Sequence, residues 1–190
     1  MSQFPVRRRM GGFTLIEAMT VIAITGILLA TGLPELANFS AQRATASAAN
    51  ALASSLRMAR AESIKRGIPV TVCPSTNANN LAPRCNGGAG DWAQGWIVLA
   101  DGGAIGAFNP GDRVVQVQPT WTTVGSITSV SAGGGVGVTF FPTGIAIGGQ
   151  RDFTFLAKSG GTTETVESLS VRLCTDTTGG TRTMRFDQAC

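Results

Sequence analysis

The sequence contains no histidine, and this absence excludes several kinds of active site. Neither a Ser-His-Asp triad nor the common zinc sites that use histidine can be built. The glycine clusters at 102–106 and 133–135 lack the following helix and the Lys-Ser/Thr pair of a phosphate-binding loop, so they predict hairpin turns. No carboxylate pair or activated nucleophile is evident. We therefore expect no enzyme, no cofactor and no metal.

Charge is also scarce, with 15 Lys and Arg against 11 Asp and Glu in 190 residues, a net charge of +4. Arg7, Arg8 and Arg9 lie together near the start and supply much of this excess. The basic balance therefore gives no evidence for a nucleic-acid surface over the whole chain. Glycine, threonine, serine and alanine are abundant instead, which suits a secreted β-rich domain with many turns.

Cysteine is limited to four residues, and no C-x-x-C spacing occurs. Three pairings are possible. Cys73–Cys85 and Cys174–Cys190 are the simplest, because each joins neighbours in sequence; free thiols or an all-cysteine zinc site are the alternatives. Disulfides persist outside the cytoplasm, and the basic start of the chain places the residues after an anchor there.

One long apolar run, from Phe13 to Leu33, contains only one acid, Glu17. Its length matches the roughly 20 residues that a helix needs to cross a hydrocarbon core. A secretory signal peptide has a shorter run and a small-residue cleavage site, which does not follow here. A plain anchor has this length but leaves Glu17 unexplained, since a carboxylate in a membrane helix costs roughly 2.5–3.5 kcal/mol.

The start of this run, Gly12-Phe13-Thr14-Leu15-Ile16-Glu17, resembles the class III signal of type IV pilins and type II secretion pseudopilins. The resemblance implies that a prepilin peptidase cuts between Gly12 and Phe13 and that Phe13 is then N-methylated. It assigns Glu17 to filament assembly. It also implies a single-pass protein of the bacterial inner membrane with its head in the periplasm, which later enters a pilus or pseudopilus.

The helix is predicted to run from Phe13 to Arg66, about 80 Å at 1.5 Å per residue, with a kink at Pro34. In the pilins, the helix loosens between a glycine and a proline that match Gly26 and Pro34; an ordinary kinked anchor is the alternative. After Pro34, Leu52, Leu56 and Ala59 recur with helical spacing and predict an apolar face.

The rest of the chain reads as strands separated by turns, with no second helix of useful length. We predict strands at 70–73, 96–99, 114–117, 136–141, 153–156, 169–173 and 183–186. The expected fold class is α+β, a long helix packed on one antiparallel sheet or two small ones. The predicted divisions are a leader at 1–12, a transmembrane half-helix at 13–33, an amphipathic half at 34–66 and a β-rich head at 67–190.

The region from Arg57 to Val98 resembles the GspH/FimT branch of minor pilins and pseudopilins. An Ala-Arg-x-Glu-rich helix end, a strand ending in Cys73-Pro74 and the element Trp92-Ala-Gln-Gly-Trp96 carry this resemblance. The two tryptophans form either an exposed platform or part of the core, and we favour the core because buried aromatics stabilise small domains. The resemblance implies a structural subunit that primes or joins a type IV pilus or a type II secretion pseudopilus.

A second hypothesis is DNA binding through Arg182 and Arg185, helped by Arg172. Some FimT-like members are associated with DNA uptake and carry a Gly-Arg-x-Arg-like element near the C terminus. Here the spacing departs from that pattern, and residues three apart point to opposite faces of a regular strand. Ordinary solvated arginines are the alternative. The expected partners are a prepilin peptidase, other pilins, the inner membrane and, under this second hypothesis, DNA.

Overall fold

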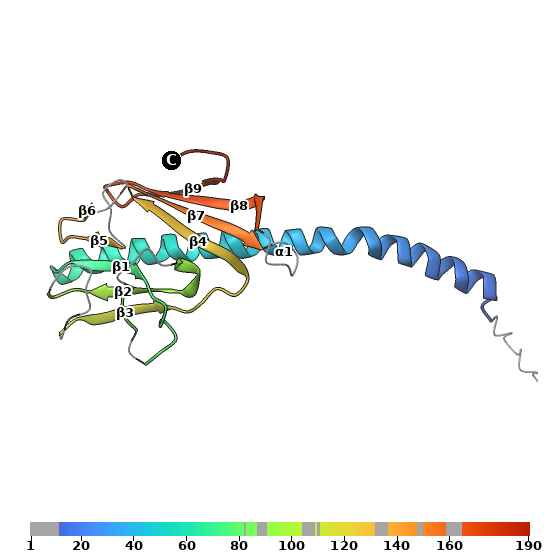
Figure 1. Cartoon of the computed structure of the whole chain (residues 1–190), viewed down its shortest axis with the longest axis horizontal. Coiled ribbons are helices and arrows are strands. Elements are labelled where there is room, and N and C mark those ends of the chain that lie inside the picture. The colour runs from blue at the N-terminus through green and yellow to red at the C-terminus, as the bar shows by residue number, and fades with distance from the viewer. Residues whose placement is uncertain are drawn as a thin grey trace, which may run out of the picture. The chain divides into compact units, whose positions relative to one another are not determined.

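The computed structural model describes residues 12–81, 83–86, 91–103, 109, 111–131, 137–147, 150–158 and 165–190, without the side chains of 31–34 and 165. Most of the predicted leader thus lies outside the described residues. One helix, α1 (Leu15–Arg66), precedes all the strands (Figure 1). The chain divides into two compact units, Met1–Leu36 and Ala37–Cys190, which are described separately below.

In the first unit, α1 exposes its side chains from Leu15 to Ala30. The helix contains one 18-residue window with a mean hydropathy of 1.9, long and apolar enough to cross a membrane by length and composition. The helix assignment continues through Pro34, whose side chain lies outside those described. The hinge between Gly26 and Pro34 stays a prediction.

In the second unit, one face of α1 is fully buried. Leu52, Leu56 and Ala59 have no exposed surface, which confirms the apolar face predicted from their spacing. Most of the other residues on this face are small, among them Ala48 and Ala49. Small side chains let the backbone of the sheets approach the helix closely, so the alanine-rich composition sets the distance between the layers.

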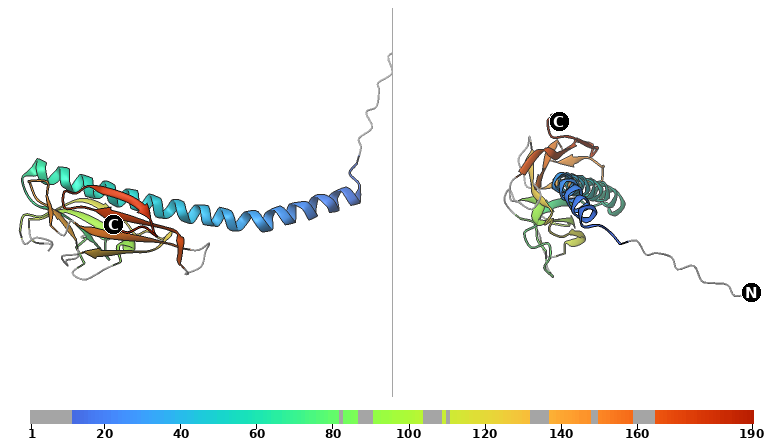
Figure 2. Two further views of the ribbon diagram at one scale, coloured as in Figure 1. Left: turned by 90° about the horizontal axis from the view of Figure 1, so that it is seen from above. Right: turned by 90° about the vertical axis from the view of Figure 1, so that its right-hand side faces the viewer.

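Among the residues that the structure describes, nine strands form two antiparallel sheets against this face (Figure 2). The five-stranded sheet has the order β3-β2-β1-β5-β6 and the four-stranded sheet the order β4-β7-β8-β9. The strands are β1 (Val70–Pro74), β2 (Trp96–Ala100), β3 (Arg113–Gln118), β4 (Val124–Ser131), β5 (Val138–Phe140), β6 (Ala146–Ile147), β7 (Arg151–Lys158), β8 (Thr165–Thr175) and β9 (Thr181–Arg185). The α+β fold class, with a helix on antiparallel sheets, is confirmed.

All seven predicted strands have a counterpart, but β4 and β6 were not predicted. The sequence of β4, Val-Gly-Ser-Ile-Thr-Ser-Val-Ser, is rich in serine and contains glycine. Only Val124 and Ile127 of this strand are buried, so it lacks the apolar alternation by which the other strands are recognised. β4 is held in an extended conformation by its antiparallel pairing with β7, because its own composition does not favour a strand.

Two tryptophans lie in the core between the helix and the sheets, as favoured from the sequence. Trp96 is completely buried and its Nε1–H donates to Ser55 Oγ of α1 at 3.0 Å. Trp92 meets the ring of Phe153 edge-on, with centroids 5.0 Å apart. Each indole therefore keeps a hydrogen bond while filling the core, since Trp92 Nε1–H also donates to Ser129 Oγ at 3.2 Å.

Gly95 lies between the two tryptophans and cannot be replaced by a larger residue without strain. Its φ is +113°, and a Cβ atom there would lie 2.5 Å from the carbonyl oxygen of Gln118. It follows the short 3-10 helix η1 (Trp92–Gln94), which Asp91 caps. Asp91 Oδ1 also accepts the backbone N–H of Ile127 at 2.8 Å, so η1 is fastened to β4.

The structure contains the two local disulfides, Cys73–Cys85 and Cys174–Cys190. The first holds the loop that follows β1, and the second fastens the last residue to β8. Each closes a short loop, of 12 and 16 residues in sequence separation, and a cross-link over such a loop is typically worth about 2–4 kcal/mol.

Leu56→Ala is expected to lower the free energy of unfolding of residues 37–190 by about 2–5 kcal/mol, because it leaves a cavity where the helix meets the sheets. Urea unfolding followed by tryptophan fluorescence measures this. Ser54→Ala, on the exposed side of the same helix, is the control and should change stability by less than about 0.5 kcal/mol. Equal losses in the two variants would contradict the assigned helix face.

Candidate functional site

The first candidate site is the exposed apolar segment that begins at Phe13. The side chain of Phe13 is 87% exposed and that of Leu15 is 78% exposed. Glu17 is also exposed and is the one acid among residues 12–30. A contiguous apolar surface of this size marks a membrane or protein contact, so this segment is expected to be covered when the protein works.

Thr14 has a local role at the start of α1 that was missed from the sequence. The backbone N–H of Glu17 donates to Thr14 Oγ1 at 3.3 Å, which makes Thr14 the N-cap of α1. Thr14-Leu15-Ile16-Glu17 is thus the pattern of a capping box, in which an N-cap threonine is followed three residues later by glutamate. The signal was available in the sequence, since Thr-x-x-Glu precedes an apolar run. The carboxylate also lies in the first turn, where the helix dipole favours a negative charge.

Threonines inside the apolar segment satisfy their hydroxyl groups within the helix. Thr20 Oγ1 donates to the carbonyl oxygen of Glu17 at 2.9 Å, and Thr25 Oγ1 to that of Val21 at 2.7 Å. Such bonds remove the need for water or a partner at these positions. The threonines are therefore compatible with an apolar surrounding. The carboxylate of Glu17 is not, and in such a surrounding it needs a partner that neutralises its charge.

The second candidate site is the outer edge of the four-stranded sheet, where Arg182 and Arg185 lie on β9. Both arginines are exposed. In the antiparallel register with β8, Arg182 is opposite Cys174 and Arg185 is opposite Val171. Because residues three apart alternate in direction, the two side chains lie on opposite faces of the sheet. The two arginines therefore lie on the edge strand β9 but do not form one cluster.

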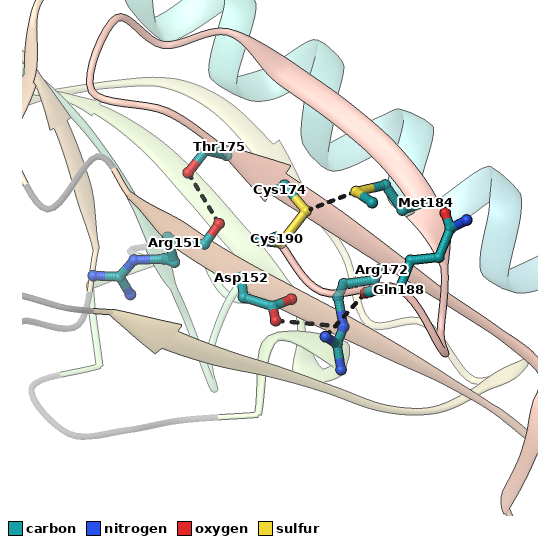
Figure 3. A network of polar contacts seen from close by, with 8 residues as sticks. All are labelled: Arg151, Asp152, Arg172, Cys174, Thr175, Met184, Gln188 and Cys190. Atoms are coloured by element: carbon teal, nitrogen blue, oxygen red, sulfur yellow. Dashed lines mark hydrogen bonds and ion pairs between the residues drawn. A yellow bond between two sulfur atoms is a disulfide. The ribbon is translucent and has the colours of Figure 1, made fainter.

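Arg172 is engaged within the molecule (Figure 3). Its Nε lies 3.4 Å from Asp152 Oδ2, and its Nη1 donates to the carbonyl oxygen of Gln188 at 3.1 Å. Its guanidinium also lies over the ring of Phe186, 5.5 Å from the centroid. Together with the Cys174–Cys190 disulfide, these contacts fold the C-terminal residues back against β8. Arg172 therefore helps to hold the C-terminal residues against β8 and does not add to a surface shared with Arg182 and Arg185.

Arg151 is a buried cation that was not singled out from the sequence. Only 2% of it is exposed, and burial lowers its pKa. Its guanidinium donates to the carbonyl oxygen of Gly137 at 3.0 Å and to Ser129 Oγ at 3.3 Å, which links β7 to β4 and to the residue before β5. A buried, hydrogen-bonded arginine of this kind ties the two sheets together. Within the described part of the chain, no group of three or more Cys, Asp and Glu residues could hold a metal ion.

Two family models match the sequence. The model described as type II transport protein GspH matches residues 48–188, and the prokaryotic N-terminal methylation motif matches residues 7–33. The first covers α1 from residue 48 onward and both sheets, and the second covers the apolar segment with Gly12, Phe13 and Glu17. No curated protein matches the chain.

Two solved structures are similar to this fold, both of the type IV minor pilin FimU of Pseudomonas aeruginosa. One, in space group P21, is 16% identical and gives a TM-score of 0.52, covering 80% of this chain and 96% of that chain. The other, in space group P65, is 17% identical, with a TM-score of 0.48 and coverages of 76% and 95%. At this identity the first structure shows a shared fold.

The raised pKa of Asp152 predicts that part of the free energy of unfolding is lost as the pH rises. Burial raises the pKa of Asp152, opposed by the charge of Arg172. The folded state therefore binds this proton more tightly than the unfolded state, so the stabilisation is full below the ordinary pKa of 3.8 and is lost as pH rises through the folded pKa. Asp152→Asn is expected to remove this component from urea unfolding of residues 37–190 measured between about pH 2 and 7.

Asp176→Asn is the control of opposite sign. The hydroxyl of Thr178, followed by the backbone N–H of Gly180, lowers the pKa of Asp176. Its stabilisation is present above the ordinary pKa of 3.8 and is lost as pH falls through the folded pKa, so this variant should change the acid side of the profile. A profile in which both variants alter the same pH range would refute the assignment.

Proposed function

This chain belongs to the GspH family of type II transport proteins, and from that premise we propose that it is a minor pilin or pseudopilin that primes or joins a filament. The observation that carries the proposal is the segment at 12–30, where exposed apolar side chains surround one carboxylate directly at the start of α1. The filament is either a type IV pilus or a type II secretion pseudopilus, which share this N terminus. No enzymatic step by this chain is involved.

Processing comes first in the proposed sequence of events. A prepilin peptidase removes residues 1–12 by cutting between Gly12 and Phe13, and the new amino group of Phe13 is methylated. The apolar segment is stored in the bacterial inner membrane with the head, residues 67–190, in the periplasm. In this arrangement the side chains from Phe13 onward are covered by lipid, which accounts for their exposure in the isolated chain.

Glu17 then fixes the position of the subunit among its neighbours. A carboxylate left alone among apolar groups is unfavourable, and the positive N terminus of an adjacent subunit neutralises it. The Thr14 cap supports this role, because a helix that starts at Leu15 holds Glu17 in its first turn. The hinge proposed between Gly26 and Pro34 would let this segment loosen as the subunit leaves the membrane.

Glu17→Gln separates the charge from the cap. Glutamine also fits the third position of a capping box, so the helix start is kept while the charge is lost. We expect this variant to be inserted and processed but to be absent from filaments, measured by immunoblotting membranes and sheared filaments of cells that express the variant. Thr14→Ala, which keeps the charge and weakens the cap by about 0.5–2 kcal/mol, should still be incorporated.

Two outcomes would contradict this assignment. Filaments that contain Glu17→Gln at the wild-type level would show that the charge is not needed. Loss of Thr14→Ala to the same extent as Glu17→Gln would show that the charge of Glu17 is not the specific requirement for incorporation. Gly12→Ala serves as the processing control and should retain the leader; a mature-sized band from this variant would refute cleavage after Gly12.

The exposure of Arg182 and Arg185 supports a second candidate function, DNA binding by the head. Contacts from two arginines at a strand edge would go to phosphates, and they would be indifferent to sequence and sensitive to salt. Arg182→Ala combined with Arg185→Ala should then weaken a gel shift of residues 37–190 at two salt concentrations, while Arg113→Ala, on β3, should not. A shift unchanged by the double substitution would reject this site.

A further inference from the structure

The side of α1 that faces away from the sheets is exposed throughout residues 37–66. A helix turns by about 100° per residue, which places Arg43, Ser47, Ser54 and Arg57 within one narrow sector on the side opposite Leu52. Each of these four residues is exposed, and so are Asn50 and Lys65 in the same sector. We call this sector the α1 stripe, defined by Arg43, Ser47, Asn50, Ser54, Arg57 and Lys65.

The α1 stripe carries three cations and no carboxylate. A solvated helix face usually mixes the two signs, because acids and bases three or four positions apart stabilise each other. Arg57 has no such neighbour, since the residues at these distances are Ala53, Ser54, Arg60 and Ala61. The positions three and four residues from Arg43 hold Phe39, Ser40, Ala46 and Ser47, so Arg43 also has no acid there. Lys65 differs, as its Nζ lies 3.9 Å from Glu62 Oε1.

The two arginines are arranged for a contact with another molecule. Arg43 is held over the ring of Phe39, with its guanidinium carbon 4.9 Å from the centroid, so a charge and an exposed aromatic ring are presented together. Between Arg43 and Arg57 the stripe carries only Ser47, Asn50 and Ser54. Their short side chains let a neighbouring surface approach the helix between the two charges.

We infer that the α1 stripe docks an acidic surface of another pilin subunit in the same filament, an inference that rests on the proposed function. Arg43 and Arg57 have no acid within reach on their own helix. Carboxylates of a neighbouring subunit would pair with these two arginines and fix the register of the two subunits. A nucleic acid fits less well. Arg43 and Arg57 lie about 21 Å apart along the axis, whereas duplex DNA presents one charge about every 1.7 Å, so few phosphates would be neutralised.

Charge reversal in the full chain tests the inference. Arg43→Glu combined with Arg57→Glu is expressed in cells that assemble the filament, and the chain is quantified by immunoblotting in membranes and in sheared filaments. We expect normal membrane levels and cleavage but a drop of about tenfold or more in filaments, because like charges would then face each other. Arg43→Lys with Arg57→Lys keeps the charges and should be incorporated normally.

The matched control, Arg84→Glu with Arg113→Glu, makes the same change of net charge at two exposed positions away from α1. Incorporation of the Arg43/Arg57 reversal at the wild-type level, or an equal loss in the control, would overturn the inference. A gel shift of DNA by residues 37–190 that this reversal abolishes would reassign the stripe to nucleic acid and likewise overturn it. Absence of the wild-type chain from filaments would instead overturn the proposed function, and so the two failures are distinguishable.

Discussion

Both sheets depend on one buried helix face, and that face is made largely of small residues. Ala48, Ala49 and Ala59 leave room for the sheets to lie close to the helix, while Leu52 and Leu56 fill the spaces between them. The indole of Trp96 completes this layer and is anchored to the helix by Ser55. A larger residue at one of the alanines would push the sheets away and separate these contacts, so the composition of the helix determines the packing of the whole unit.

Much of this arrangement could be predicted from the sequence, because the relevant patterns are local. The spacing of Leu52, Leu56 and Ala59 identified the buried face, and apolar strands such as β1 and β2 were recognisable by their β-branched residues. β4 was not, since serine and glycine give it no strand signal of its own. The bond from Ile127 to Asp91 that fastens it to η1 joins residues 36 positions apart, which spacing cannot reveal.

The candidate sites were predictable to different extents for the same reason. The residues of the N-terminal segment are neighbours in sequence, so roles for Phe13 and Glu17 could be proposed from their order alone, and these roles stay predictions. The cap from Thr14 was equally local and was overlooked. The placement of the C-terminal arginines depends on residues far from them in sequence. Arg172 is held by Asp152 and by the backbone of Gln188. The register of β9 with β8 separates Arg182 from Arg185.

The position of the cap at Thr14 has an electrostatic consequence for the processed chain. Cleavage after Gly12, as proposed, would place a positive amino group one residue before the N-cap. The helix start itself is equivalent to roughly half a positive charge. The two would add at one end of the chain, with the carboxylate of Glu17 one turn further along. Each subunit would then present opposite charges separated by only a few ångströms, so identical helices lying side by side attract one another most when they are offset along their axes.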